Sequence, residues 1–324
     1  MTQPAFMTQP VVRFLARRLA YSLVVLLGVL VVVFALVHLV PGDPVRIALG
    51  TRYTPEAYDA LRSASGLDRP IIQQFFDYIA SALTGDLGVS FRNGDPVAAI
   101  LVDRLPATAS LGVAGIVIAL LIALPAGIWS ALHEGRVSDG IVRVSSQLGV
   151  SVPDFWLGIL LIALFSTMLG WLPTSGYRPL LSDPGGWLQH LVLPGLTVGL
   201  VAAAILTRYI RAAVLEVAAM GYVRTARSKG LSPQVVTFRH TVRNALVPIL
   251  TITGIQLATI LGGVIVVEVV FAWPGLGRLV YNAVAARDYP VIQGAVLLIA
   301  VLFLLINLIV DVLYAVVDPR IRLS

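Results

Sequence analysis

The residues that could do chemistry are few and scattered along the chain. There are four histidines, no cysteine and a single lysine, Lys229, among 324 residues. A phosphate-binding loop needs Gly-Lys followed by Ser or Thr, but Ser228 precedes Lys229 and Gly230 follows it. We therefore expect no nucleotide site of that type. We also expect no Schiff-base lysine, because Lys229 is predicted to lie in a loop between apolar segments.

Two other arrangements of catalytic residue types fail on spacing. His133 and Glu134 begin a zinc-protease pattern, but Val137 stands where the second histidine would be needed. Ser175 and His190 share one predicted loop, where such a pair is usually solvated rather than catalytic. The sequence gives no support for an enzyme.

The composition places the chain in a lipid bilayer. Hydrophobic residues make up 58% of it and charged residues 12%, with a mean hydropathy of +0.90, whereas soluble domains are about 25% charged. The net charge is +6, but the basic residues flank apolar segments. They therefore indicate membrane topology rather than nucleic-acid binding.

Apolar segments long enough to cross a membrane, about 20 residues, predict an all-α polytopic protein. The first is preceded by arginines like a secretory signal, but it is too long for one and lacks a cleavage site, so we expect a retained helix. Translation can start at Met1 or at Met7. The six predicted spans are 19–40, 107–132, 141–170, 190–215, 245–272 and 291–317.

The distribution of arginine predicts the orientation. Short loops on one side of the six spans hold most of the basic residues, which is typical of the cytoplasmic side. Both termini are then cytoplasmic, and residues 41–106 form a long extracytoplasmic segment. Within it we expect helices near 55–65 and 70–83, and a third short helix that starts at Asp95–Pro96 and leads through Pro106 into the second span.

Ionisable residues near the predicted spans allow two interpretations. Such groups mark ion-coupled carriers, but they also occur as interfacial side chains or as Arg–Asp pairs between helices. A coupled carrier usually has two related halves, and we find no internal repeat. These residues are Asp154, Arg208, Arg211, Glu268 and Asp311.

The most basic run lies at residues 222–240. Gly221 should end the preceding helix, and Gly230 suits the left-handed position that ends a short helix. Ser232 and Pro233 are typical of the start of the next helix. The short helix should carry an apolar side and, nearly opposite, a charged side; the apolar residues are Tyr222, Val223 and Ala226, and the charged one is Arg224.

Two functions fit this run equally well on physical grounds. A basic loop is attracted to anionic lipid. Alternatively, a short helix bounded by glycines can insert into a groove on a cytosolic partner, with arginines setting its orientation.

A family resemblance favours the second. The run resembles the cytoplasmic loop of permease subunits of binding-protein-dependent ABC importers, and the chain as a whole resembles the first permease of the dipeptide/oligopeptide branch. The motifs that carry the resemblance are "PGDP" (41–44), "GDLGVSFRNGDPV" (85–97), "RLPAT" (104–108), "LPTSGY" (172–177), "HLVLPGLTVGL" (190–200), "YVRTARSKGLS" (222–232), "RNALVP" (243–248), "VEVVFAWPGLGRL" (267–279), "RDYP" (287–290) and "DPR" (318–320).

The resemblance implies a type I importer fold and a coupling loop at 216–244. In the family's Glu-Ala-Ala motif the glutamate position is Arg224 here, so we expect no salt bridge of the family type from it. The residues implied to couple to an ATPase are Tyr222, Arg224, Thr225, Ala226, Arg227, Lys229, Gly230 and Leu231. By topology the chain divides into residues 1–40, 41–106 and 107–324.

The resemblance also implies partners and leaves the cargo open. The partners are a sister permease, two cytosolic ATPase subunits that hold ATP and magnesium, an extracytoplasmic substrate-binding protein and membrane lipid; this chain needs no cofactor of its own. The cargo is a di- or oligopeptide, or alternatively nickel, glutathione or another small solute. An ion-coupled carrier and a passive scaffold are the rival functions. Polar residues that could line the pathway are Gln147, Ser151, Asp154 and Gln256.

Overall fold

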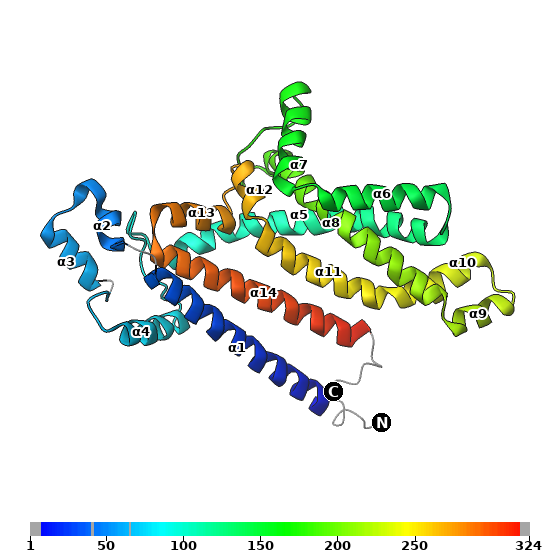
Figure 1. The fold of residues 1–324 in the computed structure, drawn as a ribbon, viewed down its shortest axis with the longest axis horizontal. Coiled ribbons are helices and arrows are strands. Elements are labelled where there is room, and N and C mark those ends of the chain that lie inside the picture. The colour runs from blue at the N-terminus through cyan, green and yellow to red at the C-terminus, as the bar shows by residue number, and fades with distance from the viewer. Residues whose placement is uncertain (1–7, 40–41, 65, 318–324) are drawn as a thin grey trace. The chain divides into compact units, whose positions relative to one another are not determined.

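The computed structural model describes residues 8–39, 42–64 and 66–317 (Figure 1). Within these residues the structure is helical and contains no strand, only one isolated antiparallel bridge between Val89 and Pro96. The all-α prediction is therefore confirmed. The predicted "DPR" motif at 318–320 lies outside the described residues.

Five of the described helical segments are long and apolar enough to cross a membrane. They form because each apolar run reaches the roughly 20 residues that span a bilayer and satisfies its backbone hydrogen bonds internally. A bent pair of helices supplies a sixth candidate span. The five lie in α1 (Thr8–Leu39), α5 (Val97–Leu132), α8 (Pro184–Ala218), α10 to α11 (Pro233–Val235 and Arg243–Gly263, joined by η3, Val236–Val242) and α14 (Tyr289–Val317).

The third predicted span, 141–170, is broken rather than continuous. α6 (Val137–Ser151) and α7 (Asp154–Leu161) meet at an angle of 101°, and α7 continues into the π-helical segment η2 (Ile162–Met168). The cause is Pro153, because proline forces the preceding residue out of the helical region; Val152 has φ −86° and ψ 124°. Apolar residues dominate the run as a whole, although Ser151 and Asp154 flank the break, so average hydropathy predicted one span.

Two other predicted boundaries are wrong. The short helix expected from Asp95 does not stop before the second span: Val97 begins α5, which runs through Pro106 without interruption. The fifth predicted span, 245–272, ends earlier than expected, because α11 stops before Val264 and α12 (Ile265–Val270) follows.

Contacts group the described residues into two compact units. The first holds residues 8–108 and 274–305, and the second holds 109–273 and 306–317. This is a different division from the topological stretches 1–40, 41–106 and 107–324, which stay a prediction.

The first unit contains short helices besides its spans. The helices expected near 55–65 and 70–83 are confirmed as α3 (Pro55–Ala64) and α4 (Ile71–Leu83). Thr54 Oγ1 accepts a 3.1 Å hydrogen bond from the Ala57 amide at the start of α3. The remaining short elements are α2 (Pro44–Leu49), η1 (Gly50–Arg52) and α13 (Leu276–Ala286), and the core consists of Val97, Leu101, Leu276, Ala283, Val291 and Ala295.

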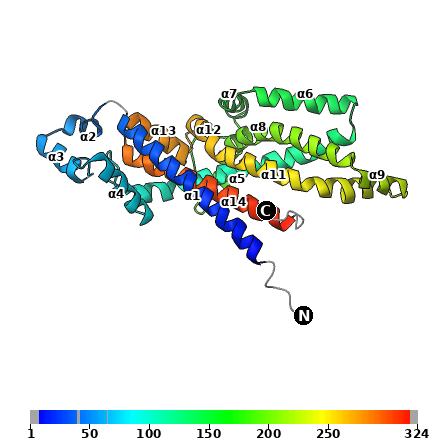
Figure 2. The same cartoon turned by 60° about the horizontal axis from the view of Figure 1, so that its bottom comes forward.

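In the second unit, α6, α7 and α11 all pack against α8 (Figures 1 and 2). Asp183 and Pro184 start α8, because the Asp183 carboxylate accepts a 2.9 Å hydrogen bond from the Gly186 amide. Glycines also allow a close approach between α5 and α8: a Cβ on Gly199 would lie 2.6 Å from Ile118 Cγ2. A packed α8 therefore forms the centre of this unit.

Candidate functional site

The predicted cytoplasmic run folds as a short helix, a turn and a second helix. α8 ends at Ala218, Met220 is extended (φ −67°, ψ 146°), and α9 (Gly221–Ser228) follows. Gly230 has φ +73°, the left-handed conformation that favours glycine. Ser232 takes the N-cap position before Pro233 as expected, but its side chain makes no capping hydrogen bond.

The apolar side of α9 is used inside this chain. Val223 is 0% exposed and Ala226 is 6% exposed, because α9 packs against η3, which contributes the buried Val236 and Thr241. Tyr222 does not join them and is 43% exposed. The apolar side predicted for this helix is therefore mostly an internal contact that holds α9 in place.

The outward surface of the loop is basic. We call it the α9 surface. Its members are all exposed, and they are Tyr222, Arg224, Thr225, Arg227, Lys229, Gly230 and Leu231. Of the eight predicted coupling residues, only Ala226 lies beneath this surface rather than on it.

The four predicted pathway residues lie on three helices. Ser151 Oγ donates a 3.0 Å hydrogen bond to the Gln147 carbonyl within α6, and both residues are exposed. Asp154 begins α7 and is half-buried, whereas Gln256 on α11 is buried. Among the described residues, neither Asp154 nor Gln256 hydrogen-bonds to the other two.

A buried ion pair joins α6 to α8. Arg211 donates to both carboxylate oxygens of Asp139, at 2.8 and 2.9 Å. Ser130 Oγ donates to the same carboxylate at 2.6 Å, and the Gly135 amide donates at 3.1 Å. Asp139 is 1% exposed, so an unpaired charge here would be costly. The Arg–Asp interpretation of Arg211 is confirmed, although the sequence did not identify Asp139 as the partner.

The predicted loop shared by Ser175 and His190 does not exist, because His190 belongs to a helix. It lies within α8, where Nδ1 is 2.7 Å from the Gly186 carbonyl. This placement gives no support for the nucleophile–base arrangement.

Motifs that are far apart in sequence meet in space. In the first unit, buried Asp288 of "RDYP" accepts hydrogen bonds from Ser90 Oγ and, at 3.1 Å, from the Phe91 amide of "GDLGVSFRNGDPV". Thr108 Oγ1 of "RLPAT" accepts a 2.7 Å hydrogen bond from the Leu276 amide of "WPGLGRL". Each of these long-range contacts thus joins one residue from one motif to a residue from another.

The second unit has an equivalent contact. The Gly176 amide of "LPTSGY" donates to the Phe271 carbonyl at 3.0 Å. Tyr177 and buried Trp273 meet edge to face, with ring centroids 4.8 Å apart. The spacing of the motifs did not reveal these pairings, because residues about 100 to 200 positions apart carry no local signal of contact.

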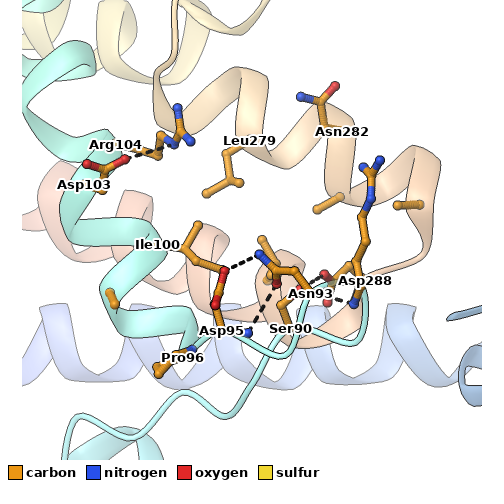
Figure 3. A pocket seen from close by; sticks show the side chains of 15 residues that line it. Ser90, Asn93, Asp95, Pro96, Ile100, Asp103, Arg104, Leu279, Asn282 and Asp288 are labelled. Carbon is orange, nitrogen blue, oxygen red and sulfur yellow. Dashed lines mark hydrogen bonds and ion pairs between the residues drawn. The ribbon is translucent and has the colours of Figure 1, made fainter.

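A polar cavity of about 660 Å³ lies beside Asp288 in the first unit (Figure 3). Asp103 lies 3.6 Å from Arg104 Nε on one wall. The loop residues Asn93 and Asp95 are joined by a hydrogen bond on another wall. With Asn282 and Arg92 also lining it, the cavity is rich in charged and amide groups.

Within the described residues, apolar helices long enough to cross a membrane and an exposed basic loop are typical of a polytopic membrane protein. Residues 11–112 match the family described as binding-protein-dependent transport system membrane component, N-terminal, and residues 123–323 match the binding-protein-dependent transport system inner membrane component. The chain belongs to this family of ABC importer permeases, which are multi-pass inner membrane proteins.

Two curated relatives cover nearly the whole chain. The di/tripeptide transport system permease protein DppB of Pseudomonas aeruginosa is 41% identical over 330 residues, covering 95% of this chain and 98% of the relative. The glutathione transport system permease protein GsiC of Escherichia coli is 43% identical over 309 residues, with the same coverages.

Solved structures share the fold at low sequence identity. An inward-facing crystal form of the MetNI methionine ABC transporter has a TM-score of 0.55 at 22% identity, covering 68% of this chain and 96% of its own. An amino acid ABC transporter crystallised with histidines has a TM-score of 0.51 at 16% identity, covering 67% and 93%. The type I importer fold is thus confirmed.

Proposed function

We propose that this chain is the permease subunit of an ATP-driven importer of short peptides, and that the α9 surface is where it receives force from an ATPase subunit. One observation carries the second part: α9 is held by the buried Val223 and Ala226 while its basic residues face outward. A rigidly held, exposed helix can transmit a displacement, whereas a loosely tethered basic loop cannot.

The packing suggests how a displacement would travel. α9 contacts both η3 and the end of α8, and η3 continues directly into α11. Movement of α9 would therefore reach two central helices of the second unit. We assign ATP and magnesium to the separate ATPase subunits, and we propose no cofactor for this chain.

The proposed complex contains a sister permease, two ATPase subunits docked on coupling loops, and an extracytoplasmic substrate-binding protein. The α9 surface and both termini face the cytoplasm. ATP-driven closure of the ATPases would then open the pathway outward by rigid-body motion. Pathway contacts are proposed for Gln147, Ser151, Asp154 and Gln256.

The proposed cargo rests on the relatives. One of them is named for di- and tripeptides, and the other for glutathione. A peptide is the class that includes both. Uptake of Ala-Ala, glutathione and nickel into cells that express the complete importer distinguishes these cargoes. Uptake that follows a proton gradient after ATPase deletion would indicate a secondary carrier instead.

A charge reversal on the α9 surface tests the coupling role. We expect the double variant Arg224→Glu, Lys229→Glu to reach the membrane at the normal level. The substrate-stimulated ATPase activity of the complex that contains it should fall at least tenfold. The reason is that both side chains are exposed, so their reversal changes the charge that a docked subunit meets without removing a buried group.

The matched control is Arg136→Glu, which reverses another exposed arginine on the predicted cytoplasmic side. We expect it to retain activity within about twofold, since a scattered surface charge contributes little. Equal activity of the double variant and wild type would contradict the assignment of the α9 surface.

A further inference from the structure

A second cavity in the first unit, of about 430 Å³, lies among α4, the start of α14, the end of α1 and the loop before α5. This volume lies within the range of small-molecule sites. Its walls combine five aromatic side chains with charged and amide groups. The aromatic members are Phe34, His38, Tyr78, Phe91 and Tyr289, and the polar members include Ser63, Arg69, Gln74, Asp77, Ser81, Asp86 and Gln293.

Two hydroxyl groups of this cavity are buried without a hydrogen-bond partner among the described residues. They belong to Tyr78 and Tyr289, and Tyr289 as a whole is only 7% exposed. Buried hydroxyls nearly always form a hydrogen bond. A buried hydroxyl without a partner in the wall of a cavity therefore indicates that a ligand or water molecule binds there. Burial also raises the pKa of Tyr78 to about 12, so its phenol stays neutral at physiological pH and can both donate and accept.

The other polar groups are mostly occupied by one another. His38 Nε2 lies 3.0 Å from Gln74 Oε1, and Gln74 Nε2 donates to the Arg69 carbonyl at 2.8 Å. Arg69 forms a 2.7 Å ion pair with Asp77. Asp86 accepts a 2.9 Å hydrogen bond from the Gly88 amide and is otherwise exposed. Within the described part of the chain, these contacts leave the two phenols and the Asp86 carboxylate available, together with the side chains of Ser63, Ser81 and Gln293.

The charge of the lining favours a cation. Arg69 neutralises Asp77, and Asp86 leaves a formal charge of −1 on the cavity. Aromatic faces attract ammonium groups, and carboxylate and phenol oxygens accept their hydrogen bonds. The combination suits a primary amine with a short polar body better than it suits an anion.

We propose that this cavity binds the amino-terminal ammonium group of a short peptide. The ammonium lies against Asp86 and the aromatic faces, and the phenols of Tyr78 and Tyr289 hydrogen-bond to it and to the first peptide group. The naming of a peptide rests on the function proposed above, whereas the recognition of a primary amine rests on the cavity alone.

Calorimetry on the assembled membrane complex in nanodiscs, without ATP or substrate-binding protein, tests the proposal. The probes are Ala-Ala and N-acetyl-Ala-Ala, which lacks the ammonium group. We expect Ala-Ala to bind at least tenfold more tightly than the acetylated form. Equal affinities, or no binding of either probe because water alone fills the cavity, would overturn the proposal.

Three variants locate the site. Tyr78→Phe and Tyr289→Phe should each weaken Ala-Ala binding about three- to tenfold, the loss of one hydrogen bond, and Asp86→Asn should weaken it at least as much. Tyr281→Phe is the matched control, because this tyrosine of α13 is 56% exposed and lies outside the cavity. Equal losses in Tyr281→Phe and Tyr289→Phe would argue against the site.

Thermal unfolding separates binding from a structural role. Removal of an unpartnered buried hydroxyl should leave the Tm of Tyr289→Phe unchanged or higher; a clear fall would mean that the hydroxyl has an internal partner, and it would overturn the proposal. ATP-dependent Ala-Ala uptake that persists in all three variants, with no measurable binding by wild type, would reject this cavity as a site and leave the importer function intact. Uptake independent of the ATPases would instead reject the importer function.

Discussion

Asp139 illustrates how a single residue can connect several elements. Its carboxylate accepts from Arg211 on α8, from Ser130 on α5 and from the amide of Gly135 between α5 and α6. If the carboxylate were removed, all of these donors would lose their partner at once. Because the site is almost fully buried, water could not readily replace it.

We predict that Asp139→Ala lowers the free energy of unfolding by about 3 kcal/mol, since it leaves the partly buried Arg211 charge with only the more distant, exposed Glu134 as a partner. Thermal unfolding in detergent, followed by tryptophan fluorescence, measures the effect. Glu134→Gln is the control: Glu134 lies 3.9 Å from Arg211 but its side chain is 65% exposed, so it should change stability little. Similar shifts in the two variants would contradict the buried-pair account.

Asp43 gives "PGDP" a physical role, because it caps α2. Its carboxylate accepts from the Val45 and Arg46 amides, at 3.0 and 3.2 Å, and from the Tyr58 hydroxyl. Burial acts to raise the pKa of Asp43, but these hydrogen bonds and the Arg62 charge outweigh it and lower the pKa below 3.8. Ionised Asp43 therefore stabilises the fold above about pH 4.

The resulting prediction concerns pH. The Tm difference between wild type and Asp43→Asn should be constant from about pH 7 to pH 5, and it should shrink as the pH falls below about 4 and the folded-state carboxyl takes up its proton. Asp59→Asn on α3, which replaces an exposed carboxylate, should show no such dependence. A Tm difference that grows toward low pH would contradict the sign of the shift.

At the scale of elements, hydropathy predicted where helices lie but not where they break. Apolar runs predicted α1, α5, α8 and α14, because an apolar segment in the bilayer must form its backbone hydrogen bonds internally and therefore becomes a helix. The break at Pro153 was missed because apolar residues dominate the run from 141 to 170 as a whole, although Ser151 and Asp154 lie close to the proline. A local rule was available: the residue before a proline avoids the helical region.

Glycines between α5 and α8 set how closely these two helices approach. A Cβ at position 199 would lie 2.6 Å from Ile118 Cγ2 and 3.1 Å from the Gly115 carbonyl oxygen, so backbone as well as side chain would have to move. We predict that Gly199→Ala lowers the free energy of unfolding by about 1 to 3 kcal/mol.

Gly140→Ala is the matched control, because Gly140 also lies within a helix, α6, but a Cβ added there would meet no described atom within 4 Å. Alanine there should be neutral or stabilise by up to about 1 kcal/mol, since it reduces the flexibility of the unfolded chain. Equal destabilisation by both substitutions would mean that helix packing is not the cause.

At the scale of the whole molecule, the sequence predicted the family, because its motifs recur in a specific order, but it did not predict the contacts that the motifs make. Ser90 and Asp288 come from two motifs and meet in the first unit, whereas Tyr177 and Trp273 come from two others and meet in the second. Local patterns carry no information about such long-range pairs. The same limit applies to Tyr78 and Tyr289. Only the three-dimensional structure shows that their buried hydroxyls have no hydrogen-bond partner among the described residues.

Orientation in the membrane is the whole-molecule property on which the proposed coupling depends, and the absence of cysteine makes it directly measurable. We predict that Lys229→Cys reacts with a membrane-impermeant maleimide only after permeabilisation, because the proposed coupling role requires the α9 surface to lie on the cytoplasmic side. Thr84→Cys, at the end of α4, should react in intact spheroplasts, and the cysteine-free parent should not react at all. Both positions are exposed, so burial cannot explain a difference, and labelling of Lys229→Cys from outside would place the α9 surface on the wrong side for an ATPase.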